Sequence, residues 1–427
     1  MHCYTHPHPI YTLNLTIGSN NQPVTLLVDT GSSDLWVVNS NNSWCSETSQ
    51  GKGEYSDDDL DSEGYENELD HTRGYSHDCS VFGTFSPTDS DTWKATPDLF
   101  SIMYGGGSWA NGTWGQDTIT IEGVEINDVY IAQSDESNQN YGILGIGYQK
   151  NEATNGGFTD EPDFIYDNLP ITMKNQGLIH KNTYSIYLDE ISDTDSAVLL
   201  FGAIDHSKYT GDLMLFPVAS NSTSLTIYLD GIYMGDGDSN VTIATGPARA
   251  LLDTGAPMTT FPDDVMDAIS DQIGAYSTTD AANYTTYFAE CSSLEDQSFT
   301  FDFMGYNLTI PLSKFVVEKS GSNCTLGLNA GGLDSADGGF CIFGDTFLSN
   351  VYFVVDLDDN EMALGLANTE CTCEDIEVIT DTIPSATQAP NYSTSQSGFN
   401  YLTVATQSSK VVKNSGAVAT ATSSSQV

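Results

Sequence analysis

The sequence predicts an all-β protein with two folded units. The chain has 427 residues, more than one ordinary domain of about 100 to 200 residues. Most of residues 10–368 consists of short runs rich in Val, Ile, Thr, Tyr and Phe, which Gly, Asn, Asp and Pro interrupt. Such runs are typical of strands joined by turns. We therefore expect helices to be few and accessory.

The clearest local patterns are four strands and one helix. The strands are expected at residues 11–17, 24–29, 118–121 and 352–356. The helix is expected at residues 262–273, because acidic residues follow Pro262 and Gly274 supplies a stop.

Two segments break the strand pattern. Residues 46–78, between Cys45 and Cys79, are rich in Asp and Glu and poor in apolar residues, which predicts a solvated, mobile loop. Residues 374–427 are rich in Ser, Thr, Ala and Gln, which predicts a disordered, O-glycosylated stalk. We expect the second segment to carry no chemistry.

The charge of the chain limits its partners. With 12 Lys and Arg against 59 Asp and Glu, the formal net charge is -47. Nucleic acid and anionic membranes would be repelled, so we expect neither as a partner. The charge favours basic peptides and an acidic medium, in which protonation of carboxylates relieves the self-repulsion of the chain.

Cysteines and glycosylation motifs indicate a secreted protein. The eight cysteines form no CxxC pair and no zinc-type spacing with His, so disulfides are expected and metal ligands are not. Asn-x-Ser/Thr acceptors recur, among them Asn14, Asn41 and Asn240. The first residues contain no apolar signal core and no run of 18 apolar residues occurs, so we expect a targeting segment to be missing from this sequence.

The strongest signal is a repeated Asp-Thr-Gly. One copy, at residues 29–31, follows the apolar pair Leu-Val, and the second, at residues 253–255, follows Leu-Leu. Two carboxyl groups held about 3 Å apart cannot both ionise, so Asp29 and Asp253 would share one proton. The ionised member would activate a water while the other donates to the developing oxyanion. Because the pair titrates as a unit, we assign neither residue a fixed role at this point.

The neighbours of the two aspartates fit the same interpretation. Gly31 and Gly255 allow tight turns beneath the carboxyl groups. Thr30 and Thr254 are expected to form hydrogen bonds that lock the two loops together.

Residues 10–368 resemble the pepsin family of aspartic proteases, and the enlarged acidic segment is similar to that of yapsin-like and candidapepsin-like fungal members, which are secreted or GPI-anchored. Residues 32–37 (Ser-Ser-Asp-Leu-Trp-Val) resemble the first active-site loop, and residues 100–108 resemble the flap hairpin. Residues 142–147 and 342–345 resemble the apolar segments beneath the two loops, and residues 184–188 the strand entering the second lobe.

This resemblance implies a bilobal fold with a cleft between two β-barrel-like lobes. The lobes are expected at residues 1–183 and 184–370. The flap residue Tyr104 would close over substrate with support from Trp36, and Gly105 and Gly106 would form the flap tip. Ser32 would support the first loop.

Two positions depart from the family pattern. Ala256 stands where many relatives carry a hydroxyl that bonds the second aspartate, so we expect a pair that works at less acidic pH, as in renin-like relatives. Gly106 replaces a polar flap residue, which is expected to lower affinity more than rate.

The resemblance also implies disulfides Cys45–Cys79 and Cys291–Cys324. Cys341 lies in an apolar run and is expected to be a buried free thiol. For Cys3, a bridge to Cys371 or Cys373 stays an open alternative.

Yapsin-like enzymes prefer cleavage beside Lys or Arg, and the acidic segment would concentrate basic peptides. Asp135 and Glu136 fall where the family lines its substrate pockets, so one of them is a candidate partner for a basic side chain.

The resemblance therefore implies an aspartic endopeptidase, which we expect to be extracellular, at the cell surface or anchored in the wall. It is expected to be a monomer made as a zymogen, to need no cofactor or metal, and to bind pepstatin-type inhibitors. The alternative is a catalytically inactive pepsin-like binding or cell-wall protein. Both aspartates and the flap tyrosine are present, which favours the enzyme.

Overall fold

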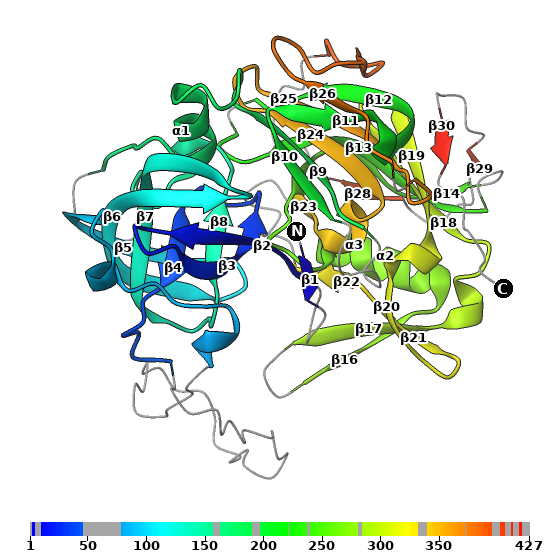
Figure 1. Cartoon of the computed structure of the whole chain (residues 1–427). Helices are drawn as coiled ribbons and strands as arrows, with labels where there is room; N and C mark the ends of the chain where they lie inside the picture. Colours follow the sequence, from blue (N-terminus) through cyan, green and yellow to red (C-terminus); the bar gives the residue numbers. More distant parts are fainter. Residues whose placement is uncertain are drawn as a thin grey trace.

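The structure is a computed structural model of the whole chain (Figure 1). The residues described here are 2–4, 10–45, 78–156, 163–189, 197–220, 222–236, 240–280, 284–331, 340–371, 373–394, 402–405, 411–412 and 418–420. The acidic segment therefore lies outside the described residues, apart from Asp78.

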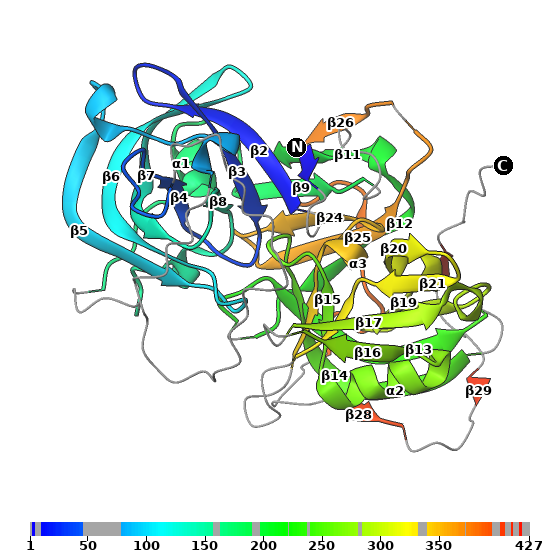
Figure 2. The same cartoon turned by 90° about the horizontal axis from the view of Figure 1, so that it is seen from below.

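One sheet forms the N-terminal part of the molecule, and most of its strands lie to one side of the later sheets in two views (Figures 1 and 2). It is eight-stranded, in the order β1-β2-β3-β8-β4-β7-β6-β5. Its strands are β1 (His2–Tyr4), β2 (Ile10–Ile17), β3 (Gln22–Asp29), β4 (Leu35–Val38), β5 (Lys94–Met103), β6 (Trp109–Ile121), β7 (Val124–Ser137) and β8 (Gly142–Gly145).

A six-stranded sheet begins the C-terminal part, in the order β10-β9-β24-β25-β12-β27. Its strands are β9 (Thr183–Tyr187), β10 (Val198–Phe201), β12 (Tyr209–Pro217), β24 (Val351–Asp356), β25 (Glu361–Ala367) and β27 (Ala386–Gln388). A separate pair joins β11 (Ala203–Asp205) to β26 (Ile376–Val378).

The largest sheet follows the path β22-β15-β23-β14-β13-β18-β19-β30, with β28 and β29 attached to β14. Its strands are β13 (Thr226–Gly235), β14 (Asn240–Leu252), β15 (Thr259–Phe261), β18 (Ser298–Phe303), β19 (Tyr306–Pro311), β22 (Leu328–Ala330), β23 (Phe340–Phe343), β28 (Thr403–Val404), β29 (Val411–Val412) and β30 (Val418–Thr420). A four-stranded sheet, β16-β17-β21-β20, completes this part. Its strands are β16 (Tyr276–Thr279), β17 (Thr285–Glu290), β20 (Val316–Ser320) and β21 (Asn323–Leu326).

Helices are short among the described residues. They are α1 (Leu169–Asn175), α2 (Asp263–Ile273) and α3 (Asp345–Leu348). Single 3-10 turns occur at Cys79–Val81, Pro87–Asp89, Gln149–Asn151, His206–Lys208, Cys291–Ser293 and Leu312–Phe315. The predicted helix is confirmed as α2, which ends where Gly274 adopts a left-handed φ of 67°.

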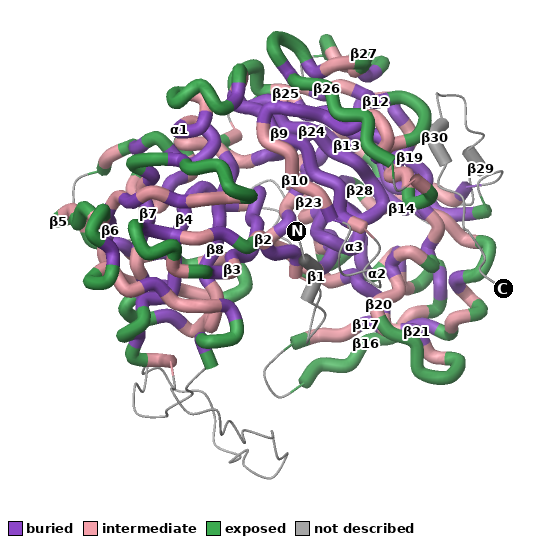
Figure 3. Tube along the Cα trace, in the orientation of Figure 1, coloured by how far each residue is buried: buried purple, intermediate pink, exposed green. Residues whose placement is uncertain are grey.

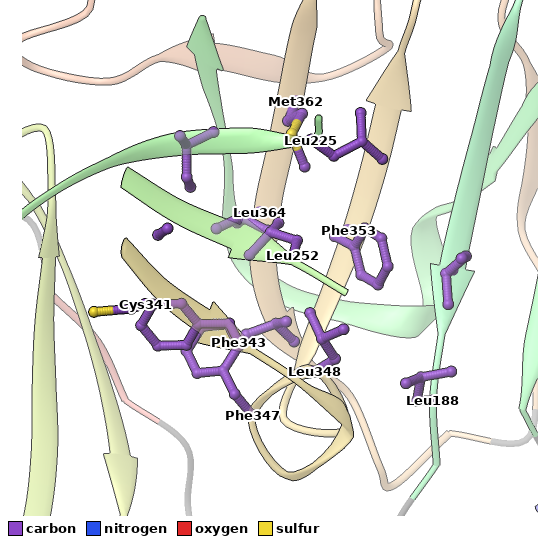
Figure 4. Close-up of a cluster of buried hydrophobic side chains, with 14 of the residues drawn as sticks. Leu188, Leu225, Leu252, Cys341, Phe343, Phe347, Leu348, Phe353, Met362 and Leu364 are labelled. Atoms are coloured by element: carbon purple, nitrogen blue, oxygen red, sulfur yellow. The ribbon is translucent and has the colours of Figure 1, made fainter. Parts of the chain in front are cut away.

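The predicted all-β fold with two lobes is confirmed. Buried residues line the inner faces of the sheets in both parts of the chain (Figure 3). Phe343, Phe347 and Leu252 pack together in the C-terminal core (Figure 4), and the rings of Phe343 and Phe347 are 4.3 Å apart. Leu252 of this core directly precedes the second Asp-Thr-Gly in the sequence. The limits of the lobes at residues 183 and 184 stay a prediction.

Among the described residues, six cysteines form three pairs. Cys45 bonds to Cys79 and Cys291 to Cys324, the pairs that the resemblance implied, and Cys341 is free and buried. The third pair is Cys371–Cys373, so the alternative that joined one of these to Cys3 is wrong. The backbone brings the two Cα atoms to 5.3 Å, within the usual range for a disulfide.

For residues 374–394, the first part of the predicted disordered stalk, the prediction is wrong. Strand β26 pairs with β11, and β27 pairs in parallel with the edge of β12. Ile379 and Ile383 are buried, with 0% and 4% exposure, against Ile204, Leu213 and Tyr352. The average composition of the segment reveals neither the two buried isoleucines nor the strands β11 and β12 with which β26 and β27 pair.

The first prediction concerns this attached segment. Ile379→Ala should lower the free energy of unfolding by about 2 to 5 kcal/mol, because it removes a fully buried side chain and leaves a cavity. Ile376→Ala is the matched control, since Ile376 is 52% exposed in the same segment, and it should change stability by less than about 0.5 kcal/mol. Denaturant unfolding measures both. Equal, small effects would show that residues 373–394 do not stabilise the fold.

Candidate active site

Asp29 and Asp253 occupy equivalent places at the ends of two strands. Asp29 ends β3, where it lies beside Gly145 of the parallel strand β8. Asp253 follows β14, and its backbone N–H donates to Phe343 O of the parallel strand β23 at 3.1 Å. The two apolar segments noted in the sequence are therefore the neighbours that fix where each aspartate loop begins.

Hydrogen bonds of the two threonines join the loops, and we call this set of hydrogen bonds the threonine cross-link. The Thr30 hydroxyl donates to Leu252 O at 2.8 Å, and the Thr254 hydroxyl donates to Val28 O at 2.7 Å. Each hydroxyl oxygen also accepts the backbone N–H of the other threonine, at 3.1 Å and 3.0 Å. Both side chains are buried, so this set of four hydrogen bonds holds the loops in one relative position.

The carboxyl groups of Asp29 and Asp253 face each other across the two glycines. A Cβ atom at Gly31 would lie 2.5 Å from Asp253 Oδ1, and one at Gly255 would lie 2.5 Å from Asp29 Oδ1. The backbone N–H of Gly31 donates to Asp29 Oδ1 at 2.7 Å, and that of Gly255 to Asp253 Oδ1 at 2.8 Å. Only glycine fits at these positions, because any side chain would displace a carboxyl group.

The surroundings of the two carboxyl groups differ. The Ser32 hydroxyl donates to Asp29 Oδ2 at 2.5 Å, whereas Ala256 leaves Asp253 without the corresponding hydroxyl. Burial and then the negative charge of Asp29 raise the pKa of Asp253 well above its usual value, although the backbone N–H of Gly255 acts in the opposite direction. The pair is thus arranged to hold one proton, with Asp253 the favoured carrier.

Tyr104 lies at the tip of the hairpin formed by β5 and β6. Its backbone N–H donates to Ser108 O at 2.8 Å, which closes the turn, and Gly105 and Gly106 are exposed in that turn. The Trp36 indole N–H donates to the Tyr104 hydroxyl oxygen at 2.9 Å. Burial, followed by the charge of Asp29, raises the pKa of Tyr104 well above its usual value. Tyr104 of this hairpin therefore lies close to Asp29.

Asp135 and Glu136 lie near the end of β7 and are both exposed. The Asn39 side-chain amide donates to Asp135 Oδ1 at 2.7 Å. In the hydrogen bonds of the described residues, neither side chain meets Asp29 or Asp253, so the structure does not join them to the pair.

Asp345 is a residue of the site that the sequence analysis named only as the end of an apolar segment. It is fully buried, and within the described residues neither carboxyl oxygen has a hydrogen-bond partner. Burial, and then the charges of Asp253 and Asp29, raise its pKa well above the usual value. The available signal was an acidic residue directly after the run Ile-Phe-Gly, where the chain passes beneath the second loop. Asp34 is a second fully buried acid near the pair, and its carboxyl oxygens accept hydrogen bonds from Ala153 and Tyr166.

Among the residues that the structure describes, no group of three or more His, Cys, Asp or Glu side chains is arranged to hold a metal ion. The facing carboxyl groups of Asp29 and Asp253 are suited to proton transfer.

Comparisons with known proteins agree with this geometry. Residues 10–368 match the family described as eukaryotic aspartyl protease. The chain is 34% identical over 475 residues to aspartic proteinase 3 of Saccharomyces cerevisiae, covering 98% of this chain and 81% of that protein. It is 34% identical over 371 residues to secreted aspartic protease 10 of Candida albicans, covering 87% and 74%. The fold is similar to the crystal structure of the aspartic proteinase from Irpex lacteus, with a TM-score of 0.64, 22% identity, and coverage of 85% and 96%.

The second prediction tests the threonine cross-link. Thr254→Val keeps the shape but removes the hydroxyl, leaving the Val28 carbonyl and the Thr30 N–H buried without partners, which should cost about 2 to 5 kcal/mol of stability. Thr254→Ser retains the hydroxyl and should cost less than about 1.5 kcal/mol. Thermal unfolding compares them. Equal losses for Val and Ser would mean that packing of the methyl group, and not the hydrogen bonds, holds the loops.

Proposed function

Because the chain belongs to the eukaryotic aspartyl protease family, we propose that Asp29 and Asp253 are the two carboxyl groups with which this aspartic endopeptidase hydrolyses peptide bonds. The observation that carries the proposal is the facing of the two carboxyl groups across Gly31 and Gly255. A single hydroxyl, that of Ser32, distinguishes them. One carboxyl group is therefore suited to ionise and the other to keep its proton.

The reaction proceeds in two steps. Asp29 takes a proton from a water as the water oxygen adds to the carbonyl carbon, and Asp253 gives its proton to the carbonyl oxygen. In the resulting gem-diol, Asp29 passes its proton to the amide nitrogen and Asp253 recovers one from a hydroxyl. The carbon–nitrogen bond then breaks, leaving a carboxylic acid and an amine. The buried position of the pair strengthens these transfers, because little water competes.

The hairpin tip covers the substrate in this proposal. Tyr104, held by the Trp36 indole, closes over the bound peptide, and the exposed backbone at Gly105 and Gly106 offers hydrogen bonds to the peptide backbone. Since these glycines carry no side chain, the tip recognises an extended chain and not a particular residue.

Basic peptides are the proposed substrates. The net charge of -47 attracts Lys and Arg side chains to the protein surface, and the resemblance to yapsin-like enzymes favours the same residues. The exposed carboxylates of Asp135 and Glu136 are the candidate partners for such a side chain. Asp135 is tied to Asn39.

We further propose that the protein acts outside the cell, secreted or anchored to the cell surface or wall, as a monomer that pepstatin-type inhibitors block. The disulfides support an oxidising compartment, and the glycan acceptors Asn14 and Asn41 are exposed. Asn240, in contrast, is 2% exposed in β14, so glycosylation is not expected there. In the described part of the chain, no helix is long and apolar enough to cross a membrane.

The third prediction tests the function itself. The purified chain, freed of any propeptide, is incubated with an unbiased peptide library between about pH 3 and pH 7, with and without pepstatin. We expect pepstatin-sensitive cleavage that Asp29→Asn lowers by at least about 10⁴-fold, while Asp263→Asn, at an exposed residue of α2, leaves it unchanged.

The cut positions decide the finer proposal. Enrichment of Lys or Arg beside the cut bond, reduced in Asp135→Asn or Glu136→Gln, would support the basic preference and identify its partner. No cleavage by folded protein would favour the inactive binding protein instead.

The fourth prediction uses the difference between Ser32 and Ala256. Ser32→Ala removes a donor to the ionised Asp29, so it should raise the pKa of the pair and move the acid limb of kcat/KM upward by about one pH unit. Ala256→Ser adds a donor near Asp253, which carries the proton in the active form, so it should move the alkaline limb of kcat/KM downward by a similar amount. Steady-state pH profiles measure both. Shifts in the same direction would contradict the proposed assignment of donors.

A further inference from the structure

The segment that follows β8 holds the first aspartate loop through the backbone. The N–H of Gly147 donates to Ser32 O at 2.8 Å, and the Ser33 hydroxyl donates to Tyr148 O at 2.7 Å. A Cβ atom at Gly147 would lie 2.8 Å from Ser32 O, so the two backbones are in direct contact. The residues just after the glycine turn are therefore tied to this segment.

Asn151 adds a side chain to this contact. It ends the single 3-10 turn Gln149–Asn151, and its backbone N–H donates to Tyr148 O at 2.8 Å. Its side-chain Nδ2 donates to Gly31 O at 3.1 Å. Asn151 is half-buried, and it lies 120 positions after Gly31 in the chain. No local sequence pattern indicates such a contact.

The Gly31 carbonyl belongs to the peptide unit that lies between the two donors to Asp29. Before it, the Gly31 N–H donates to Asp29 Oδ1 at 2.7 Å, and after it the Ser32 hydroxyl donates to Asp29 Oδ2 at 2.5 Å. Because a peptide unit is planar and rigid, fixing its oxygen limits its rotation, and with it the positions of both donors. Asn151 therefore acts on Asp29 through the backbone between Gly31 and Ser32.

The segment that carries Asn151 is itself held from behind. Asn168, which is 2% exposed, donates from Nδ2 to Gly147 O at 3.0 Å. Gln149 Nε2 donates to Tyr166 O at 2.6 Å. Both Tyr166 and Asn168 lie directly before α1. A side chain holds a loop in place only from a fixed base, and these hydrogen bonds provide that base for Asn151.

The second aspartate loop has the backbone contact without the side-chain contact. The N–H of Asp345 donates to Ala256 O at 2.8 Å, which matches the backbone contact made after β8. In the described part of the chain, no side chain donates a hydrogen bond to Gly255 O, the counterpart of the oxygen that Asn151 holds. Asn151 thus supports the loop of Asp29, the residue proposed to ionise.

We propose that Asn151 is a positioning residue that keeps the peptide between Gly31 and Ser32 turned so that both neighbouring donors reach the ionised Asp29. The proposal rests on the proposed function and adds a residue to it. In the hydrogen bonds of the described residues, the Asn151 side chain meets neither aspartate, so it acts through the loop. Without its amide, the peptide rotates more freely and both donors to Asp29 weaken.

Asn151→Ala tests the loss of this hydrogen bond. Weaker donation to the ionised Asp29 raises the pKa of the pair, so the acid limb of kcat/KM should move upward, by less than in Ser32→Ala. At the pH optimum we expect kcat to fall about two- to tenfold, the effect of one ordinary hydrogen bond, with KM unchanged.

Asn155→Ala is the matched control for this variant. Asn155 is exposed in the same segment, and its Nδ2 donates to Lys150 O at 2.8 Å. It therefore loses a similar hydrogen bond to a backbone oxygen, but one outside the aspartate loop. Neither kcat nor the acid limb should change.

Asn151→Asp keeps the shape of the side chain and makes its hydrogen bond depend on pH. A neutral carboxyl group can donate to Gly31 O, whereas an ionised one can only accept. The ratio of kcat in Asn151→Asp to kcat in the unaltered protein should be close to one at about pH 3 and fall about two- to tenfold at about pH 6, because the usual Asp pKa is about 4. The same ratio in Asn155→Asp should stay constant.

Three outcomes would overturn the proposal. The first is an unshifted acid limb in Asn151→Ala, since a merely structural role lowers stability without moving that limb. The second is an equal ratio at both pH values in Asn151→Asp. The third is a loss that appears in KM alone, because Asn151 would then contact substrate instead of positioning Asp29.

Asn151→Asp keeps the test decisive if Asn151→Ala does not fold, because its neutral form preserves the hydrogen bond. If the unaltered chain cleaves no peptide, the proposed function fails, and thermal unfolding of Asn151→Asp decides the contact itself. The folded variant favours the neutral carboxyl group, so its stability relative to the unaltered protein should be retained below about pH 4 and lost as the pH rises above that value. A constant difference would show that Asn151 does not hold Gly31.

Discussion

Two carboxyl groups that share one proton must be held at a fixed separation, and the rest of this structure depends on that constraint. Like charges at close range repel, so the protein needs covalent geometry or strong hydrogen bonds to keep Asp29 and Asp253 together. Thr30 and Thr254 supply these bonds across the junction of the two lobes. Each threonine uses both its donor and its acceptor, and no polar atom of this cross-link is left for water.

The sheets act as the support of this cross-link. Each aspartate loop leaves a strand that has a parallel neighbour, β8 for the first and β23 for the second. These neighbours approach so closely that a Cβ atom at Gly145 would lie 2.5 Å from Asp34 N, and one at Gly344 would lie 2.2 Å from Ala256 O. The loops therefore rest on backbone instead of on flexible side chains, which limits how far the carboxyl groups can move.

Buried acids gather around the site and link it to the pH of the medium. Burial raises the pKa of Asp34, Glu152, Asp253 and Asp345. Each is neutral in acid and becomes costly to keep buried as it ionises, so each contributes stability that disappears as the pH rises. The strongly acidic surface acts in the same direction, because self-repulsion also grows with pH. Stability and the proton shared by the aspartate pair thus favour the same acidic conditions.

The sequence by itself determined the features that depend on neighbours along the chain. These are the strand-rich pattern, the two Asp-Thr-Gly turns and the helix that ends at Gly274, since propensity and turn chemistry act over a few residues. Only the tertiary structure decided which buried polar groups meet. The Tyr166 hydroxyl, for example, donates to Asp34 although the two residues are 132 positions apart in the chain. The tertiary structure also decided the pairing of Cys371 with Cys373 and the docking of residues 373–394, whose two buried isoleucines are invisible in the average composition of the segment.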